Sequence, residues 1–302
     1  MRIGLVLPMS SAAERVLGFA RRAEEIGFDG LFAFDHLFPP GAPPDRPSLE
    51  AYTTLASVAS VTDRIALGTL VTRASLRPAG VLAKQAVGLD DISGGRFVLA
   101  VGTGDALSKA EHTTFGLPYL GPDVRRDHLV ETVRALRALF GGRRWAGGEH
   151  VAAIDGPLAP PPVTPGGPPI WLGGTAPASV DAAARLGDGW NAWAIDPDGF
   201  SDRVERLRST AETARRSVEP TWGGAIVVGR DRDEADRLHR ERRARGLDDG
   251  AFVGDVDEVV ARLNAYGAAG ATWAIVLAGG GRDRIEVLAE DVLPRVRVAD
   301  AT

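Results

Sequence analysis

The sequence predicts a (β/α)8 barrel, and three observations support this fold class. Eight short runs of apolar, strand-forming residues alternate with helical patterns along a chain of 302 residues. The runs are continuously apolar, which is typical of parallel strands covered on both faces. Several runs end in glycine, aspartate or histidine, and the carboxyl ends of barrel strands are where sites are built. We expect one barrel domain over residues 1–302; a doubly wound open sheet is the alternative fold.

Each strand is expected where an apolar run meets a turn signal, as where Pro8 ends the first run. The expected strands cover 3–7, 30–34, 65–71, 97–101, 170–173, 189–193, 222–228 and 272–277. Helical patterns cover 11–26, 50–61, 78–91, 124–140, 174–187, 197–217, 231–245, 257–266 and 284–296. Trp190 and Trp193 are expected to share one face of their strand, in the barrel core or against an aromatic ligand.

The length beyond a minimal barrel falls in three insertions. Two follow the strands over 30–34 and 97–101, and one precedes the strand over 170–173. Because two of the three follow strands, they lie at the end of the barrel where sites are built. We expect residues 105–122 to form a loop or partial lid, and residues 149–155 to form a small hairpin strand.

Composition excludes several classes of function. The net charge of −5 gives no electrostatic footprint for nucleic acid or an anionic membrane. The chain has no cysteine, which excludes disulfides, thiolate metal sites and a cysteine nucleophile. Its five histidines lack ligand spacing, so we expect no metal site. The apolar start is too short for a signal peptide and no run could span a membrane, so we expect a cytoplasmic protein.

Two carboxyl-end positions carry candidate acid–base chemistry. Asp35 and His36 follow the second expected strand, and a histidine there can give or take a proton near neutral pH. Asp105 follows the fourth expected strand and a Gly-Thr-Gly turn, so it can face the same cavity as His36. The alternative for each residue is a capping role in the loop that follows.

Two glycine-rich turns are candidate ligand cradles. The turn at 102–104 resembles half of a dinucleotide fingerprint, but Leu107 occupies the position of the third glycine, which disfavours a Rossmann dehydrogenase. Residues 173–176 join a strand to the start of a helix, where free backbone N–H groups can hold a phosphate. A tight turn between strand and helix is the alternative for both segments.

Together these segments resemble the luciferase-like superfamily, in particular its branch of oxidoreductases that use the deazaflavin coenzyme F420. The resemblance runs nearly end to end, and the order and spacing of the motifs carry it. The motifs are Asp35-His36, Leu67-Gly68-Thr69 with Val71, Arg77-Pro78, Gly94-Gly95-Arg96-Phe97, Val101-Gly102-Thr103-Gly104-Asp105, Gly173-Gly174-Thr175 and Arg185-Leu186-Gly187-Asp188-Gly189-Trp190.

The resemblance implies a flavin-like ring bound at the carboxyl end of the barrel. A cis peptide bond between Leu70 and Val71 would form a bulge that backs the ring. The ring or its polyol chain would contact Asp35, Thr103, Gly104 and Ser108. The chain and its phosphate would lie on the turn formed by Gly173, Gly174, Thr175 and Ala176, in line with the helix-start argument above.

The resemblance also implies roles in proton transfer. In the sugar-phosphate dehydrogenases of this branch, a histidine equivalent to His36 and a glutamate equivalent to Asp105 are proposed to serve hydride transfer. We therefore expect His36 to give or take the proton, with Asp105 as the second catalytic residue. Here the second residue is an aspartate, and Pro40 stands where those enzymes carry a tryptophan. A sugar-phosphate substrate is therefore disfavoured.

The expected function is hydride transfer between F420 and a small organic substrate. One alternative is an FMN-dependent monooxygenase on the same barrel, and a second is a non-catalytic flavin-binding protein. Related barrels are commonly homodimers, so we expect a homodimer by analogy.

Overall fold

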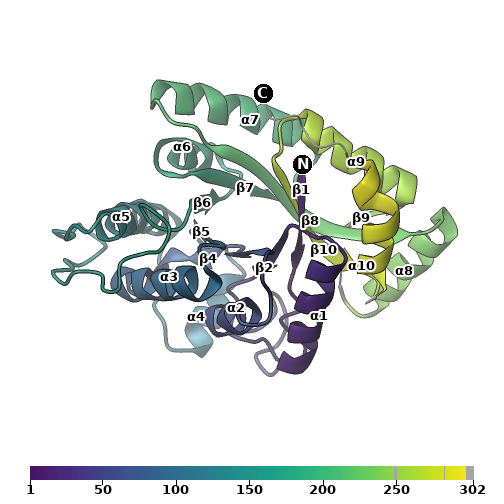
Figure 1. The fold of residues 1–302 in the computed structure, drawn as a ribbon, viewed down its shortest axis with the longest axis horizontal. Coiled ribbons are helices and arrows are strands. Elements are labelled where there is room, and N and C mark those ends of the chain that lie inside the picture. Colours follow the sequence, from purple (N-terminus) through teal and green to yellow (C-terminus); the bar gives the residue numbers. More distant parts are fainter. Residues whose placement is uncertain (248–249, 282, 297–302) are drawn as a thin grey trace.

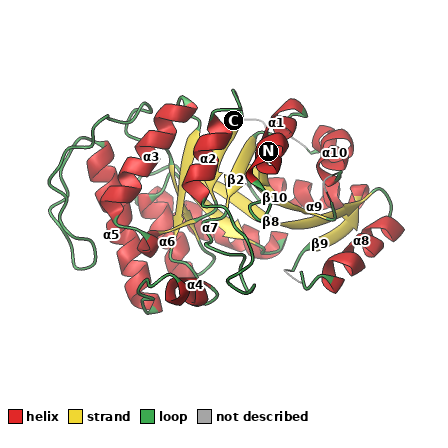
Figure 2. Cartoon of the chain, turned by 90° about the horizontal axis from the view of Figure 1, so that it is seen from below, coloured by secondary structure: helices red, strands yellow, loops and turns green. Residues whose placement is uncertain are grey.

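In the computed structural model, which describes residues 1–247, 250–281 and 283–296, eight parallel strands of the described chain close into a barrel (Figure 1). Strand β10 closes the barrel, because it pairs with β1 on one side and with β8 on the other. Helices surround the strands (Figure 2). The predicted (β/α)8 class is therefore confirmed.

The strands lie close to the predicted runs. In chain order they are β1 (Arg2–Val6), β2 (Gly30–Ala33), β3 (Ala66–Thr69), β4 (Thr72–Arg73), β5 (Phe97–Gly102), β6 (Ile170–Gly173), β7 (Gly189–Trp193), β8 (Glu219–Gly229), β9 (Phe252–Asp255) and β10 (Trp273–Gly279). The expected strand over 65–71 is shorter, because the chain leaves β3 after Thr69 and resumes pairing with β5 as β4.

The helices follow the strands as a barrel requires. They are α1 (Ala13–Glu25), α2 (Ala51–Ala59), α3 (Ala79–Ser93), α4 (Ser108–Thr114), α5 (Pro122–Phe140), α6 (Pro177–Leu186), α7 (Pro197–Thr213), α8 (Arg232–Ala244), α9 (Val256–Ala268) and α10 (Arg284–Val287). The last of these continues as a π-helical turn, Leu288–Val292, and a 3₁₀ turn, Leu293–Arg295. A further 3₁₀ turn, Ala74–Leu76, follows β4.

The three insertions lie where the sequence predicts them, but two differ in form. Residues 105–122, expected as a loop, contain the helix α4. The expected hairpin strand over 149–155 is reduced to one antiparallel bridge between Trp145 and Ile154. The sequence also misses β9, a short strand that pairs with the far end of β8. Strand β9 and helix α8 lie at one end of the molecule, with α3 and α5 at the other (Figures 1 and 2).

Aromatic rings fill the barrel interior. The Phe32 ring lies 5.9 Å from the ring of Trp171 and 5.7 Å from that of Trp273, and all three side chains are buried. Glycines on β2 itself and on the neighbouring strands β1 and β3 make room for Phe32, because a Cβ on any of them would lie within 2.8 Å of its ring. These glycines are Gly4, Gly30 and Gly68.

The expectation that Trp190 and Trp193 share a face is wrong. Successive side chains of a strand point to opposite faces, so two residues three positions apart cannot face the same way. Trp190 lies outside the barrel, stacked on Phe200 of α7 at 5.5 Å. Trp193 lies inside, with its ring edge-on to Phe34 at 5.2 Å.

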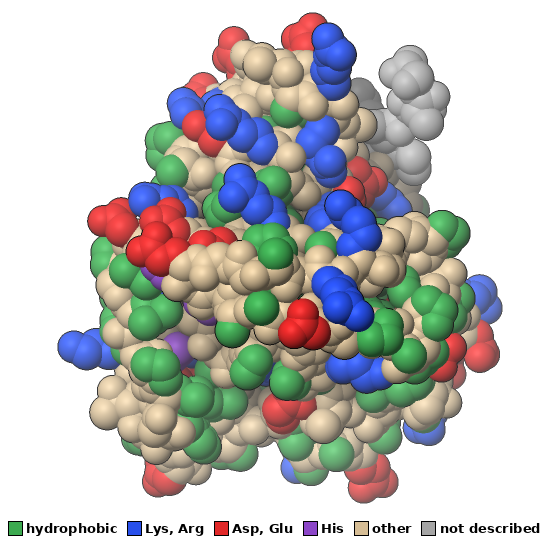
Figure 3. Space-filling view, turned by 90° about the vertical axis from the view of Figure 1, so that its left-hand side faces the viewer, with side chains coloured by type: hydrophobic (Ala, Val, Ile, Leu, Met, Phe, Trp, Pro, Cys, Tyr) green, Lys and Arg blue, Asp and Glu red, His purple; other side chains and the backbone are tan. Residues whose placement is uncertain are grey.

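The surface carries mixed charge. On the side where α3 and α5 lie, acidic, basic and hydrophobic side chains are interspersed (Figure 3). Within the described ranges, no helix combines the length and the apolar character needed to cross a membrane.

Candidate active site

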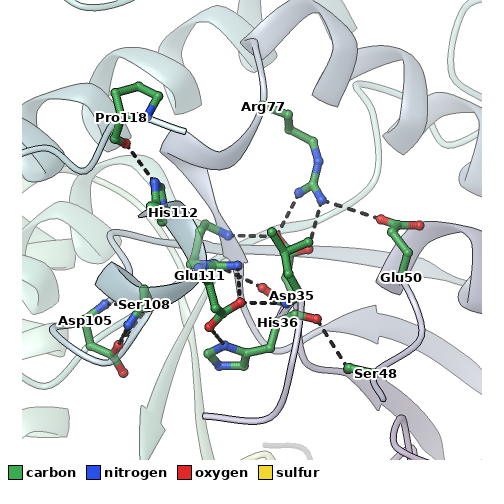
Figure 4. Close-up of polar contacts among 12 residues, drawn as sticks. Asp35, His36, Ser48, Glu50, Arg77, Asp105, Ser108, Glu111, His112 and Pro118 are labelled. Atoms are coloured by element: carbon green, nitrogen blue, oxygen red, sulfur yellow. Dashed lines mark hydrogen bonds and ion pairs between the residues drawn. The ribbon is translucent and has the colours of Figure 1, made fainter. Parts of the chain in front are cut away.

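His36 lies just beyond the carboxyl end of β2 and is held there by a glutamate. Its Nδ1 lies 2.6 Å from Oε1 of Glu111, which comes from α4 (Figure 4). The His36 side chain is 20% exposed, whereas that of Glu111 is 1% exposed. One edge of the imidazole therefore faces a buried carboxylate, and the ring keeps access to solvent.

Three groups from two segments bind the Glu111 carboxylate: His36 and Leu37 after β2, and Arg73 of β4. Its Oε2 accepts hydrogen bonds from the backbone N–H of Leu37 at 2.6 Å and from Nη2 of Arg73 at 2.8 Å. Burial opposes ionisation of this carboxyl group, but the contact with His36, the Leu37 N–H and the Arg73 charge outweigh burial. The pKa of Glu111 is therefore lowered from its ordinary value, and the group is ionised at neutral pH.

Asp35 is buried and its carboxylate is fully engaged. Arg77 donates to both of its oxygens, at 2.8 and 2.9 Å, and the backbone N–H of Arg73 donates at 3.1 Å. The Asp35 side chain is only 2% exposed. Burial lowers the pKa of Arg77, but its hydrogen bond and ion pair with Asp35 outweigh burial and raise it. The geometry gives Asp35 a supporting position behind the wall of the site.

The peptide bond between Leu70 and Val71 is cis, as the resemblance implies. It lies between β3 and β4, at the carboxyl end of the barrel. Two contacts tie this bulge to the segment that carries His36: the Leu70 N–H donates to the Ala33 carbonyl at 2.8 Å, and the Arg73 N–H donates to Asp35. The bulge and His36 therefore form one connected rim.

The structure does not bring Asp105 to His36. Asp105 is exposed, and its Oδ1 accepts hydrogen bonds from the N–H and the hydroxyl of Ser108, both at 3.0 Å. It therefore stabilises the first turn of α4, and Figure 4 shows this pair apart from the contact of His36 with Glu111. Ser108, which was expected to contact the cofactor, is buried and donates both hydrogen bonds to Asp105.

The turn after β5 keeps Thr103 and Gly104 at the rim. Both are partly exposed, and the Thr103 hydroxyl donates to the Gly104 carbonyl at 3.0 Å. Gly104 has φ +70°, a left-handed conformation that favours glycine. A Cβ here would also lie 3.2 Å from Cδ of Arg73. This turn therefore brings backbone close to the Arg73 side chain.

The turn from Gly173 to Ala176 opens α6 with no side-chain cap. Gly174 has φ +130°, and its carbonyl accepts the Trp190 indole N–H at 2.7 Å. Thr175 and Ala176 are small: Thr175 is partly exposed and Ala176 is exposed. The Gly174 N–H donates to the Asn191 carbonyl at 3.1 Å, and Pro177 at the start of the helix has no N–H. The backbone N–H groups of Thr175 and Ala176 are therefore the ones in this turn that could bind an anion.

Sequence reasoning missed Glu111 and Arg73. Glu111 stands in a segment expected as a loop, and no motif marks it. The only available signal is that a carboxylate follows Ser108 by three positions, the spacing of a capping box, which would have indicated a helix. Arg73 lies only two residues after the bulge. A charged side chain so close to a buried bulge is expected to need a partner of opposite charge.

A sequence model of the family described as luciferase-like monooxygenase matches residues 1–246. The F420-dependent hydroxymycolic acid dehydrogenase of Mycobacterium tuberculosis is 35% identical over 199 residues, which are 64% of this chain and 53% of that protein. The chain spans about half the length of the curated relatives it matches.

Two solved structures share the fold over nearly their whole length. An F420-dependent secondary alcohol dehydrogenase in complex with an F420–acetone adduct has a TM-score of 0.85 at 20% identity, covering 98% of this chain and 99% of that one. A monooxygenase from Streptomyces bottropensis has a TM-score of 0.79 at 23% identity, covering 98% and 100%. With the family match over most of its length, the chain belongs to the luciferase-like monooxygenase family.

Proposed function

We propose that this protein is an oxidoreductase that transfers a hydride between coenzyme F420 and a small organic substrate. The observation that carries the proposal is the connected rim, in which hydrogen bonds join the Leu70–Val71 bulge to the segment that carries the accessible imidazole of His36. It places a proton-exchanging group beside an apolar wall. A relative and a structural neighbour whose names state F420 dependence support the choice of cofactor.

The residues present fit a deazaflavin with an anionic tail. Leu70 and Val71 would back the ring, and Thr103 and Gly104 would border it from the end of β5. The start of α6, from Gly173 through Gly174 and Thr175 to Ala176, would hold the tail phosphate. The N–H groups of Thr175 and Ala176 would donate to it, because the Gly174 N–H donates to the Asn191 carbonyl. When bound, F420 accepts or supplies the hydride, and the protein orients it and handles protons.

His36 would exchange the proton that accompanies hydride transfer. Asp105 would be a second group, since its carboxylate is exposed at the same end of the barrel. Asp35 and Ser108, both buried and hydrogen-bonded, would shape the pocket from behind.

An FMN-dependent monooxygenase is the second candidate, because a monooxygenase shares the fold over the whole chain. A non-catalytic flavin-binding protein is a third candidate, and the accessible histidine held by a buried carboxylate favours an enzyme over it. Binding of F420 or of FMN distinguishes the proposed oxidoreductase from the FMN-dependent monooxygenase.

Fluorescence titration of the apo protein with F420 and, separately, with FMN tests the proposal. We expect saturable binding of F420; tight binding of FMN without a response to F420 would overturn the cofactor. His36→Ala should retain F420 binding and lose about 10²-fold or more in turnover, whereas His239→Ala on α8 serves as the matched control. Unchanged turnover in His36→Ala would remove His36 from the reaction.

We also propose that residues 1–302 form one domain and that two copies associate as a homodimer in the cytoplasm. The pairing of β1 with β10 supports one domain, because it joins the two ends of the described chain in one barrel. Exposed Val81 and Ile92 on α3 offer apolar surface for a partner copy. The lack of cysteine fits a reducing compartment. Sedimentation and cell fractionation test these proposals.

A further inference from the structure

We infer that Glu111, held by Arg73, is a positioning residue that fixes His36 as the tautomer protonated on Nδ1, so that Nε2 is the atom that exchanges the substrate's proton. The inference rests on the proposed function for the purpose of that proton. The orientation itself rests on the hydrogen bonds of the protein alone.

The first step is the identity of the donor in the short contact between His36 and Glu111. An ionised carboxylate has no proton and can only accept. Arg73 and the Leu37 N–H both donate to Oε2, which favours the ionised form of Glu111. Nδ1 of His36 must therefore carry the hydrogen in the 2.6 Å contact with Oε1.

The second step concerns the opposite edge of the ring. With the proton on Nδ1, a neutral His36 presents a lone pair on Nε2, and a charged His36 presents an N–H there. In the part of the chain that the structure describes, no protein group is hydrogen-bonded to Nε2. Nε2 is therefore the ring nitrogen that can form a hydrogen bond with the substrate.

The third step is the charge around the ring. Arg73 and Glu111 form one buried ion pair, and Arg77 and Asp35 form a second beside it. These four charges cancel, and Arg77 also pairs with the partly exposed carboxylate of Glu50 at 3.5 Å. The cluster therefore carries one negative charge when His36 is neutral and none when His36 takes a proton. Glu111 lies against the ring and stabilises its positive charge.

The proton balance of the reaction then follows. Addition of a hydride to a polar double bond leaves an electron pair on the heteroatom, which takes the proton from Nε2 of charged His36. In the reverse direction, the hydride leaves carbon while the O–H or N–H proton moves to Nε2 of neutral His36. Nδ1 keeps its hydrogen bond to Glu111 in both directions.

Asp105 acts on this arrangement through α4. Its contacts with Ser108 begin the helix, and Glu111 lies one turn further along. Asp105, which the sequence predicts as the partner of His36, thus helps to position Glu111, which is the observed partner.

The tautomer can be measured in the apo protein by long-range ¹H–¹⁵N NMR of ¹⁵N-histidine-labelled samples, with His36 assigned from His36→Gln. At a pH where the ring is neutral, we expect the hydrogen on Nδ1 and a bare Nε2. His112 is an internal reference, because its Nδ1 lies 2.7 Å from the Pro118 carbonyl, which can only accept. A His36 ring protonated on Nε2 in the native protein would overturn the inference without any variant.

Glu111→Gln gives the sharper result. Arg73 and the Leu37 N–H both need an acceptor, so the amide oxygen will take the place of Oε2 and the NH₂ group will face His36. Nδ1 must then accept, and the hydrogen moves to Nε2. We expect this inverted tautomer for His36 in Glu111→Gln, with His112 unchanged. Retention of the hydrogen on Nδ1 would show that Glu111 does not set the tautomer.

Activity separates this inference from the proposed function. Glu111→Gln should bind F420 as the native protein does and lose roughly 10²–10⁴-fold in kcat. An inverted tautomer with full turnover would overturn the role of Nε2. Failure of the native protein to bind F420 would overturn the proposed function, while the NMR result would still decide the orientation of His36.

Discussion

The side chain of Val71 occupies the space that a Cβ on Gly102 would need, with Cγ2 only 2.6 Å from that position. On its other side, Cγ1 of Val71 lies 2.9 Å from the position of a Cβ on Gly173. The bulge after β3 is therefore wedged between the ends of β5 and β6. Two motif glycines that the sequence assigns to ligand contact also serve packing.

We predict that Gly102→Ala destabilises the protein by about 1–3 kcal/mol, because the added methyl overlaps Val71 in a packed site. Urea unfolding measures this loss. Val71→Ala in the same chain removes the overlapping methyl groups and should restore part of the stability. Gly18→Ala on α1 is the control, since no atom lies within 4 Å of its added Cβ, and it should be neutral or slightly stabilising. Equal effects at both glycines would contradict the wedge.

Arg96 gives the motif Gly94-Gly95-Arg96-Phe97 a structural role, because its guanidinium binds carbonyl groups at the carboxyl ends of α2 and α3. It donates to the carbonyls of Ala59, Thr62, Ile65 and Ser93 and to the Thr62 hydroxyl. Lysine cannot reproduce this planar fork, so Arg96→Lys should lose about 2 kcal/mol or more in urea unfolding. Arg126→Lys, at an exposed pair on α5, should change stability by less than about 0.5 kcal/mol.

Glu24 makes stability depend on pH. Burial opposes its ionisation, but hydrogen bonds from the backbone N–H groups of residues 63–65 outweigh burial and lower its pKa. A lowered folded-state pKa gives stability that is present above the unfolded value of about 4.3 and is lost as pH falls through the folded value. Urea unfolding at several pH values should therefore show native protein and Glu24→Gln differing at neutral pH and converging in acid.

The control for this pH series is Glu25→Gln, whose side chain is 65% exposed. It should follow the native protein within about 0.5 kcal/mol at every pH. A constant gap between native protein and Glu24→Gln down to acid pH would show that the lost hydrogen bonds do not depend on ionisation.

Asp35→Asn tests whether Asp35 supports the wall from behind. The change removes the buried partner of Arg77, whose side chain is 12% exposed, and leaves it only the more exposed carboxylate of Glu50 at 3.5 Å. Breaking a buried pair in this way costs about 3–5 kcal/mol, which thermal or urea unfolding of the apo protein would detect. Asp123→Asn, 83% exposed on α5, should have almost no effect. An Asp35→Asn protein as stable as the native one would contradict this supporting role.

Much of the fold was predictable because barrel strands are continuous apolar runs. Such runs place β1, β5 and β10 within a few residues of their observed bounds. Strand β9 escaped because its four residues are mostly half-buried and its pairing partner is the far end of β8, a long-range contact that no local pattern reports.

The site was predictable in part. His36 follows from its motif at a strand end, where local sequence decides position, whereas the Leu70–Val71 bulge follows from the resemblance to the family. The partner of His36 did not follow, because Glu111 reaches it from 75 residues away and only after α4 has formed. Asp105 follows the end of β5, as the sequence predicts. Its carboxylate, however, accepts hydrogen bonds from the nearby Ser108.

The rings of Phe32, Trp171 and Trp273 have a consequence for how a ligand enters and leaves the site. In the part of the chain that the structure describes, they fill the barrel interior, so a ligand of the proposed enzyme would reach His36 from the carboxyl end. Substrate and product of the proposed reaction would therefore enter and leave by the same opening. We expect product release from such a site to slow as the substrate concentration rises.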